Sequence, residues 1–421
     1  MRGRAMKVGH ADEADERPVP LSLLVVLAFT GATAPMAIDL YLASFPAMQR
    51  DLVTTPAMVQ MTVTAYLLGM AIGQPIWGPL SDRYGRRAPL VVSNSLALVA
   101  SFVVMLAPSI HIFIGARLFH AMFGAAGVVI ARAMITDLAR GFPAVRALAL
   151  LTTMMQVVPI VAPPIGGLLA TFVPWRGVLA VLTALVALQL LVTCLLVPET
   201  LSPNRRSAKL RFRRMGTVLK RPAFMVNGLA VAMATSTMLV YVASSSFVFQ
   251  EVLGFSPMAF SLAFTASAMC LVAGGLLAAR LARRRVNPRR TVGFALPGLI
   301  GSGLLIVVAA LSPWPVLLVI PTLTNSFCAN LIMSNSMAMA MQHARDMSGT
   351  GAAVIGIMTY GIGAAASPLS GVIGDGKSAV PMGIVMTAFA VLGAIIFISG
   401  RRVGGLPVHE SGSAAESKGT G

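Results

Sequence analysis

The sequence predicts an all-α polytopic membrane protein with twelve transmembrane helices in two pseudo-symmetric six-helix bundles. Of the 421 residues, 57% are hydrophobic and 11% are charged, whereas a soluble globular chain carries roughly a quarter charged residues. The apolar residues also come in runs of about 20 or more, which is the length that crosses a bilayer as a helix. These observations argue against a soluble multi-domain enzyme.

Twelve apolar runs follow one another along the chain, and each is long enough for one span. Proline and glycine inside the runs do not exclude helix, because neighbouring helices in lipid re-satisfy the freed backbone groups. The predicted spans cover residues 21–45, 57–80, 88–108, 110–131, 147–173, 177–197, 223–249, 257–281, 291–311, 314–338, 349–373 and 380–398.

The loops between these runs alternate in charge. One set of alternate loops holds only Arg50, Arg176 and Lys377. The other set is rich in arginine and lysine: residues 83–87, 140–146, 205–221, 280–290 and 345. Because basic loops stay in the cytoplasm, the sequence predicts a multi-pass protein of the inner membrane with both termini cytoplasmic, and the even number of spans agrees.

The net charge of +18 follows from this loop pattern. No nucleic-acid partner is expected, because the chain has no folded polar domain to carry a nucleic-acid interface. The three cysteines, Cys194, Cys270 and Cys328, lie inside apolar runs without metal or redox spacing, so they are interpreted as small core side chains and no metal site is expected.

Three short segments recur in the same order about 200 residues apart, as parallel repeats in transporters do. YLASF (41–45) resembles YVASS (241–245), PIGG (164–167) resembles PLSG (368–371), and GQPIWGPLSDRYGRR (73–87) resembles GGLLAARLARRRVNPRR (274–290). The predicted organisation is a cytoplasmic tail 1–20, a first bundle 21–201, a cytoplasmic linker 202–222, a second bundle 223–400 and a disordered cytoplasmic tail 401–421.

Two ionisable residues of opposite charge lie inside predicted spans. Asp39 in span 1 and Arg117 in span 4 each lie about seven residues from the outer end, roughly 10 Å deep at about 1.5 Å per residue. Ionisable residues at such depth are costly and mark functional sites. We expect Asp39 and Arg117 to pair across a central cavity and to exchange a proton; a static ion pair is the alternative. His120, one turn from Arg117, is interpreted as a proton relay or as a packed neutral side chain.

The stretch 73–87 places an acid among arginines at the inner end of span 2. Its glycines allow close backbone approach and a tight turn. For Asp82 we expect two kinds of partner: the nearby arginines, and the N-terminus of span 11 at SGTG (348–351), whose hydroxyls suit capping. Asp137 offers a second anion for Arg83 or Arg86. We expect these residues to form a cytoplasmic gate: Gly73, Gly78, Asp82, Arg83, Gly85, Arg86 and Asp137.

The order of residues in 73–87 resembles the loop signature of the major facilitator superfamily. RLFHAMFGAAGVVIARAMITD (117–137) resembles the family's span 4 motif, whose arginine is implicated in proton coupling, with His120 and Ala121 as departures. VPIVAPPIGGLLA (158–170) resembles the span 5 motif typical of antiporters, although Ala162 replaces a frequent glycine. The motif positions are Pro163, Pro164, Gly166 and Gly167.

Two further stretches, IDLYLASFPAM (38–48) and LIMSNSMAMAMQHARDMSGTGAAVIG (331–356), resemble the Bcr/CflA drug:proton antiporters, including chloramphenicol and florfenicol exporters. This resemblance implies proton-coupled efflux of multidrug or amphenicol type by alternating access. It implies a transporter and not an enzyme, with no cofactor beyond the proton gradient. The expected partners are a small-molecule drug, protons and the lipid bilayer, and the expected state is a monomer.

Polar side chains inside the spans are the candidates for drug binding. Buried amides and phenols can orient a ligand, although in lipid they equally pin helices together. The candidates are Tyr41, Tyr66, Asn227, Tyr241, Asn330 and Asn335. The alternative within transport is export of a small metabolite such as a sugar or an amino acid. A membrane sensor would need a cytoplasmic effector domain, which the short tails do not offer, and no cluster of residues suggests an enzyme.

Overall fold

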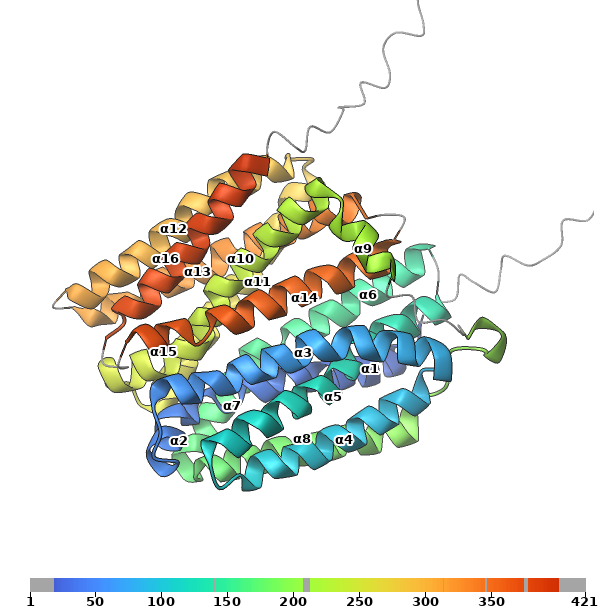
Figure 1. The fold of residues 1–421 in the computed structure, drawn as a ribbon, viewed down its shortest axis with the longest axis horizontal. Helices are drawn as coiled ribbons and strands as arrows, with labels where there is room; N and C mark the ends of the chain where they lie inside the picture. Colours follow the sequence, from blue (N-terminus) through green and yellow to red (C-terminus); the bar gives the residue numbers. More distant parts are fainter. Residues whose placement is uncertain are drawn as a thin grey trace, which may run out of the picture.

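A computed structural model describes residues 19–139, 141–206, 213–312, 314–344, 347–374 and 378–400. Residues 1–18, 207–212 and 401–421, which hold most of the predicted tails and part of the predicted linker, lie outside these ranges, as do Arg140, Arg345 and Lys377. The described residues form helices joined by short loops (Figure 1).

The first bundle contains eight α-helices and one 3-10 turn. They are α1 (Leu21–Asp39), η2 (Leu42–Ser44), α2 (Phe45–Asp51), α3 (Pro56–Tyr84), α4 (Arg87–Leu106), α5 (Ile110–Leu138), α6 (Gly141–Gln156), α7 (Val158–Phe172) and α8 (Trp175–Leu196). Some predicted spans are interrupted: span 1 is α1 followed by η2 and α2, and span 5 is α6 followed by α7.

The second bundle follows η3 (Pro203–Arg205) and α9 (Arg213–Leu219) of the predicted linker. Its elements are α10 (Pro222–Phe247), the π-helical η4 (Val248–Val252), α11 (Pro257–Arg283), α12 (Pro288–Leu311), η5 (Pro315–Leu318), α13 (Val319–Gln342), α14 (Ser348–Ala366), α15 (Leu369–Ile373) and α16 (Val380–Ser399).

Eleven stretches of the described helices are long and apolar enough to cross a membrane. The remaining predicted span corresponds to α13, which has 24 residues. It is less apolar because it carries Asn325, Asn330 and Asn335, and all three of these side chains are buried. Helix α13 packs against α10, α11 and α12, so the bundle interior covers its polar side chains.

Small residues let the helices of a bundle approach closely. In α3, a Cβ added at Gly69 or Gly73 would lie 2.2 Å from a backbone oxygen of α5, that of Leu118 or Met122. Such close approach is typical of helix pairs in membranes, where packing and not the hydrophobic effect holds helices together. Gly73, expected at the gate, therefore joins α3 to α5 within the first bundle.

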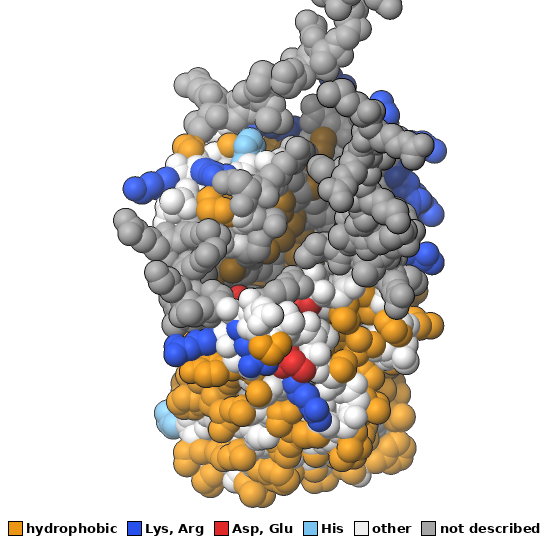
Figure 2. Space-filling view, turned by 90° about the vertical axis from the view of Figure 1, so that its right-hand side faces the viewer, with side chains coloured by type: hydrophobic (Ala, Val, Ile, Leu, Met, Phe, Trp, Pro, Cys, Tyr) orange, Lys and Arg blue, Asp and Glu red, His pale blue; other side chains and the backbone are white. Residues whose placement is uncertain are grey.

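The two bundles meet along α3 with α14 and along α7 with α11. We call the end of the molecule that carries Arg83, Arg86, Arg280 and Arg283 the basic end, and the other the opposite end. The bundles diverge towards the basic end, on the side where α6 and α9 lie in Figure 1. Figure 2 looks onto this end, where Lys and Arg side chains gather and a recess separates the bundles.

Candidate functional site

Helix α1 ends at Asp39, inside the first predicted span. Pro35 lies within the helix, and beyond Asp39 the chain turns through Leu40 and Tyr41 into η2. The Asp39 side chain is 8% exposed and forms no hydrogen bond or ion pair with the residues that the structure describes. A carboxylate at the negative end of a helix dipole gains nothing from that helix. The interruption between α1 and η2, called the break below, therefore holds a buried acid that helix α1 itself does not stabilise.

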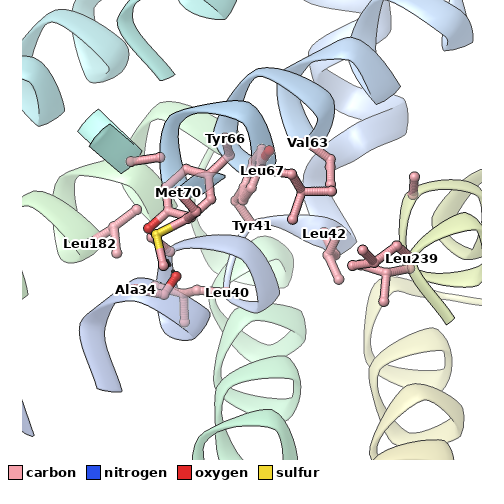
Figure 3. Close-up of a cluster of buried hydrophobic side chains, with 14 of the residues drawn as sticks. Ala34, Leu40, Tyr41, Leu42, Val63, Tyr66, Leu67, Met70, Leu182 and Leu239 are labelled. Atoms are coloured by element: carbon pink, nitrogen blue, oxygen red, sulfur yellow. Dashed lines mark hydrogen bonds between the residues drawn. The ribbon is translucent and has the colours of Figure 1, made fainter. Parts of the chain in front are cut away.

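The guanidinium of Arg117 is fully buried and lies between two tyrosine rings. Its Cζ lies 4.5 Å from the ring centre of Tyr41 and 4.4 Å from that of Tyr66, a favourable cation–π arrangement. Its Nη2 donates to the carbonyl oxygen of Ala37 at 2.7 Å. Figure 3 shows the two tyrosines beside the break in α1.

The expected ion pair between Asp39 and Arg117 is not formed in this structure. The physical reason is a competing acceptor, because the last carbonyl groups of a helix have no partner within it. Arg117 takes that of Ala37 in the last turn of α1. His120 is 3% exposed and meets the Tyr66 ring edge-on at 5.8 Å. Its contacts are those of a packed side chain, and its Nδ1 lies 3.5 Å from Arg117 Nη1.

The six candidate drug-binding residues are buried and bonded to protein groups. The hydroxyl of Tyr41 bonds to Thr62 Oγ1 at 2.9 Å, and that of Tyr66 donates to the carbonyl of Ala34 at 3.0 Å. The hydroxyl of Tyr241 bonds to Ser267 Oγ at 3.0 Å.

The three asparagines likewise bond to backbone carbonyls. Asn227 and Asn335 donate to the carbonyl four residues before them, while Asn330 donates to Leu271 and so joins α13 to α11. Asn330 thus pins two helices together, as the alternative interpretation expected. Binding of a drug by any of the six stays a prediction.

A compact ionic cluster lies at the basic end of the first bundle. Arg86 is 6% exposed; its Nε donates to Asp137 Oδ2 at 2.7 Å and its Nη1 to Asp82 Oδ1 at 2.6 Å. Ser81 also accepts from Nη1, at 2.8 Å. Of the two arginines expected for Asp137, Arg86 is the one that binds it. Arg83 lies over the ring of Tyr84 instead, 5.2 Å from its centre.

A partner for Asp82 at the start of α14 is not seen. The N-cap residue of α14 is Met347, without a side-chain cap, and the side chain of Ser348 lies outside the described part. The carboxylate of Asp82 is instead bound by Arg86, and its side chain is 52% exposed. All contacts that the structure describes for the cluster lie within the first bundle.

Glu199 completes this cluster, although sequence reasoning missed it. Its carboxylate accepts the backbone N–H groups of Arg86, Arg87 and Leu201, at 2.8, 3.2 and 2.9 Å. Partial burial opposes its ionisation, but these N–H donors outweigh burial and hold the pKa of Glu199 below its usual range. The only signal in the sequence was an acid directly after span 6, on the side that is otherwise basic.

Gly85 makes room for that carboxylate. Its φ is +91°, a conformation that favours glycine, and a Cβ there would lie 2.3 Å from Glu199 Oε2. The expected tight turn at Gly85 is therefore present. At Gly78 an added Cβ would meet Val129 of α5 at 3.5 Å, which is ordinary contact.

The glycines of the predicted antiporter motif face two directions from α7. A Cβ at Gly166 would lie 2.0 Å from the carbonyl oxygen of Leu40, at the break in span 1. One at Gly167 would lie 2.3 Å from Ser261 Oγ of α11, in the second bundle. The motif, which begins with Pro163 and Pro164, thus lets α7 fit between the break and the other bundle.

Hydrogen bonds close the opposite end between the bundles. Ser246 and Gln250 of the second bundle donate to the carbonyls of Leu42 and Ala43 in η2, at 2.6 and 3.0 Å. The side-chain oxygen of Gln60 accepts the N–H of Gly371 at 3.1 Å. An ion pair, Arg50 to Glu251 at 2.9 Å, spans the same junction. We call these contacts the seal; no motif in the sequence pointed to them.

Comparisons with known proteins agree with this architecture. The family model of the Major Facilitator Superfamily matches residues 27–368. The chain belongs to the major facilitator superfamily. An uncharacterized MFS-type transporter, YdgK of Bacillus subtilis, is 31% identical over 94% of this chain and 99% of its own. The bicyclomycin resistance protein homolog of Haemophilus influenzae is 25% identical over 89% of this chain and 94% of its own.

Solved structures show the same superfamily fold at low identity. The nucleoside transporter NupG superposes with a TM-score of 0.73 at 12% identity, over 90% of this chain and 98% of its own. A D-xylose–proton symporter gives 0.70 at 14% identity, over 88% and 96%. Membership of the superfamily makes the protein a multi-pass membrane transporter of small molecules and not an enzyme, as expected. Within the described residues, no group of His, Cys, Asp or Glu could hold a metal ion.

Proposed function

We propose that this chain is a proton-coupled exporter of small drugs, of multidrug or amphenicol type, that works by alternating access in the inner membrane. Relatives named for bicyclomycin and chloramphenicol resistance support the drug class. The positive-inside rule supports a cytoplasmic basic end and cytoplasmic termini. In this proposal the protein works as a monomer, and the proton gradient supplies the energy without a cofactor.

The observation that carries this proposal is the buried acid at the break in span 1. Asp39 has no partner among the described residues, while Arg117 binds the carbonyl of Ala37, two residues before it. A small shift of α1 along α5 would exchange the carbonyl for the carboxylate as the acceptor of Arg117. Because an added positive charge favours the ionised form of a nearby acid, such a shift would release a proton from Asp39.

The conformation is one that the proposed cycle requires. The seal closes the opposite end and the bundles diverge at the basic end (Figure 1), so a drug would enter the cleft from the cytoplasm. Opening to the outside requires the seal to break. We propose that the basic end then closes through the cluster of Arg86, with the exposed Asp82 as its contact to the second bundle.

Substitution of the buried acid tests the coupling. Asp39→Asn is expected to lower chloramphenicol efflux driven by an imposed pH gradient in proteoliposomes by about 100-fold or more, because proton transfer by a placed group contributes this order of rate. Equilibrium binding of chloramphenicol to the purified variant should persist. Asp51→Asn, at an acid of the opposite end that is 48% exposed, is the matched control and should retain efflux. Wild-type efflux by Asp39→Asn would exclude the proposed coupling role.

A further inference from the structure

Two contacts between the bundles at the opposite end correspond to each other in the internal repeat. Helices α3 and α11 both begin with a proline that follows a capping hydroxyl residue, and their fifth residues are Gln60 and Ser261. Gln60 meets the last glycine of PLSG, because a Cβ at Gly371 would lie 2.6 Å from its Oε1. Ser261 meets the last glycine of PIGG, with 2.3 Å between its Oγ and a Cβ at Gly167. We call these the Gln60 contact and the Ser261 contact.

The Gln60 contact joins the bundles through buried hydrogen bonds. The side chain of Gln60 is 3% exposed. Its Oε1 accepts the N–H of Gly371 at 3.1 Å and the hydroxyl of Ser370 at 3.3 Å. One turn further along α3, Thr64 Oγ1 bonds to Ser367 Oγ at 2.7 Å. Each of these bonds must break when α3 moves away from span 11.

The Ser261 contact has the same layout without comparable hydrogen bonds. The hydroxyl of Ser261 is buried and has no hydrogen-bond partner in the described part of the chain. Thr265 corresponds to Thr64, but its hydroxyl donates to the carbonyl of Ser261 in its own helix at 2.9 Å. The carbonyl of Ile160 in α7 is further from it, at 3.4 Å. The Ser261 contact therefore depends on the close packing that Gly167 allows.

The difference follows from where the two spans are interrupted. Span 11 is interrupted between α14 and α15, so Gly371 lies in the first turn of α15. N–H groups of a first turn lack a partner one full turn back, and that of Gly371 is shared between Gln60 and the carbonyl of Pro368 at 3.0 Å. Gly167 lies well inside α7, where backbone N–H groups bond within the helix. Only the Gln60 contact therefore has a backbone N–H to bind.

We propose that the opposite end opens unequally at these two contacts. The Gln60 contact is a latch that holds the end closed, and the Ser261 contact is the packed surface on which the bundles turn. Hydrogen bonds weaken steeply with distance and angle, so a small separation breaks the latch, whereas packed surfaces can slide while they stay in contact. Gln60 and Thr64 are positioning residues of this conformational change. The inference rests on alternating access in the proposed function, and on neither the drug nor the proton.

A thiol placed beside the seal measures the opening. Ser44 follows the two carbonyl groups of η2 that the seal binds. Its side chain is 2% exposed, and its hydroxyl has no hydrogen-bond partner in the described structure. Ser44→Cys, in a chain whose three native cysteines are replaced by alanine, supplies a single thiol. In nanodiscs, a water-soluble maleimide reaches this thiol when the opposite end opens, so the labelling rate is proportional to the open fraction if opening is fast.

Matched variants of the two contacts test the inference in this chain. Gln60→Ala and Thr64→Val should each raise the labelling rate about fivefold, the order expected for one net hydrogen bond. The corresponding variants Ser261→Ala and Thr265→Val should stay within about twofold of the starting rate, because they remove no strong bond. Equal acceleration by both pairs would show that the contacts open alike and would overturn the inference. An unchanged rate in Gln60→Ala and Thr64→Val would overturn it as well.

A second thiol separates opening from general loosening of the fold. Native Cys328 is buried in the core of the second bundle, and its labelling as the only thiol should not change in Gln60→Ala or Thr64→Val. A parallel rise at Cys328 would assign the effect to lost stability and overturn the inference. The labelling needs no drug and no pH gradient. Unequal contacts in a protein that fails to export chloramphenicol would therefore support the inference and contradict the proposed function.

Discussion

The two bundles use corresponding tyrosines in different ways. Tyr41 and Tyr241 each bond through the hydroxyl to a hydroxyl side chain of the next long helix. The ring of Tyr41 covers the guanidinium of Arg117 at 4.5 Å, whereas the ring of Tyr241 stacks on Phe264 at 5.5 Å. The same scaffold thus holds a buried charge in the first bundle and an aromatic contact in the second.

The basic ends of the two bundles also differ in whether they bury a charge. In the first bundle Arg86 is buried between Asp82 and Asp137. In the second, Arg280 and Arg283 are exposed, and no described acid forms an ion pair with them. The two bundles therefore share a fold but not the ion pairs at their basic ends. Most of the candidate chemistry that the structure describes lies in the first bundle.

The largest expected effect on efflux comes from removing the charge between the tyrosine rings. Arg117→Gln should abolish pH-driven efflux and destabilise the protein by about 2 kcal/mol or more, because a desolvated cation–π contact alone contributes about that much. Asn325 lies near the start of α13, as Arg117 lies near the start of α5. Its amide is buried and has no hydrogen-bond partner within the described structure.

Asn325→Leu should therefore leave stability unchanged or raise it, because a buried amide without a partner already carries its desolvation cost. Efflux in proteoliposomes and thermal unfolding of both purified variants check the comparison. Efflux loss in Asn325→Leu that matches the loss in Arg117→Gln would show that the second bundle carries chemistry of equal weight.

The second comparison concerns the two basic ends. Arg86→Gln leaves the buried carboxylate of Asp137 without its main partner, and removal of one member of a buried ion pair costs about 3 kcal/mol or more. Arg280→Gln, at an exposed side chain, should lie within about 0.5 kcal/mol of the wild type. Thermal unfolding in detergent measures both.

The double variant Arg86→Gln with Asp137→Asn provides the control. It removes both charges, so it should recover part of the stability that Arg86→Gln loses. Additive losses would show that the two side chains act independently, contrary to their 2.7 Å contact.

The sequence predicts the fold well, because a run of apolar residues identifies a membrane span without knowledge of the helices that pack against it. The sequence does not locate the points at which a helix is interrupted within a span. Helix α1 ends at Asp39, although the apolar run continues to Phe45, because a break depends on acceptors and neighbours outside the run. Pro35 and Pro46 were the available signals.

The candidate site follows the sequence in part. Asp137 was expected to bind Arg83 or Arg86, and it binds Arg86, because both residues lie at the basic ends of neighbouring helices. Equal depth did not make Asp39 a partner of Arg117, since depth fixes neither the rotation of a helix nor the acceptors that compete. Glu199 binds the backbone of Arg86 from 113 residues further along the chain, and no local sequence pattern encodes such a contact.

The smallest expected effect concerns Glu199, which accepts backbone N–H groups at the start of α4 in the first bundle. Glu199→Gln removes a negative charge from the start of α4, where such a charge contributes under about 1 kcal/mol. The pKa of Glu199 lies below its usual range in the folded protein, so its contribution is present above the pKa of the unfolded chain and disappears as the pH falls through the folded value. Wild type and variant should therefore differ slightly in thermal unfolding near neutral pH and converge in acid. A difference that persists below the folded pKa would mean that Glu199 acts through the shape of the Gly85 turn and not through its charge.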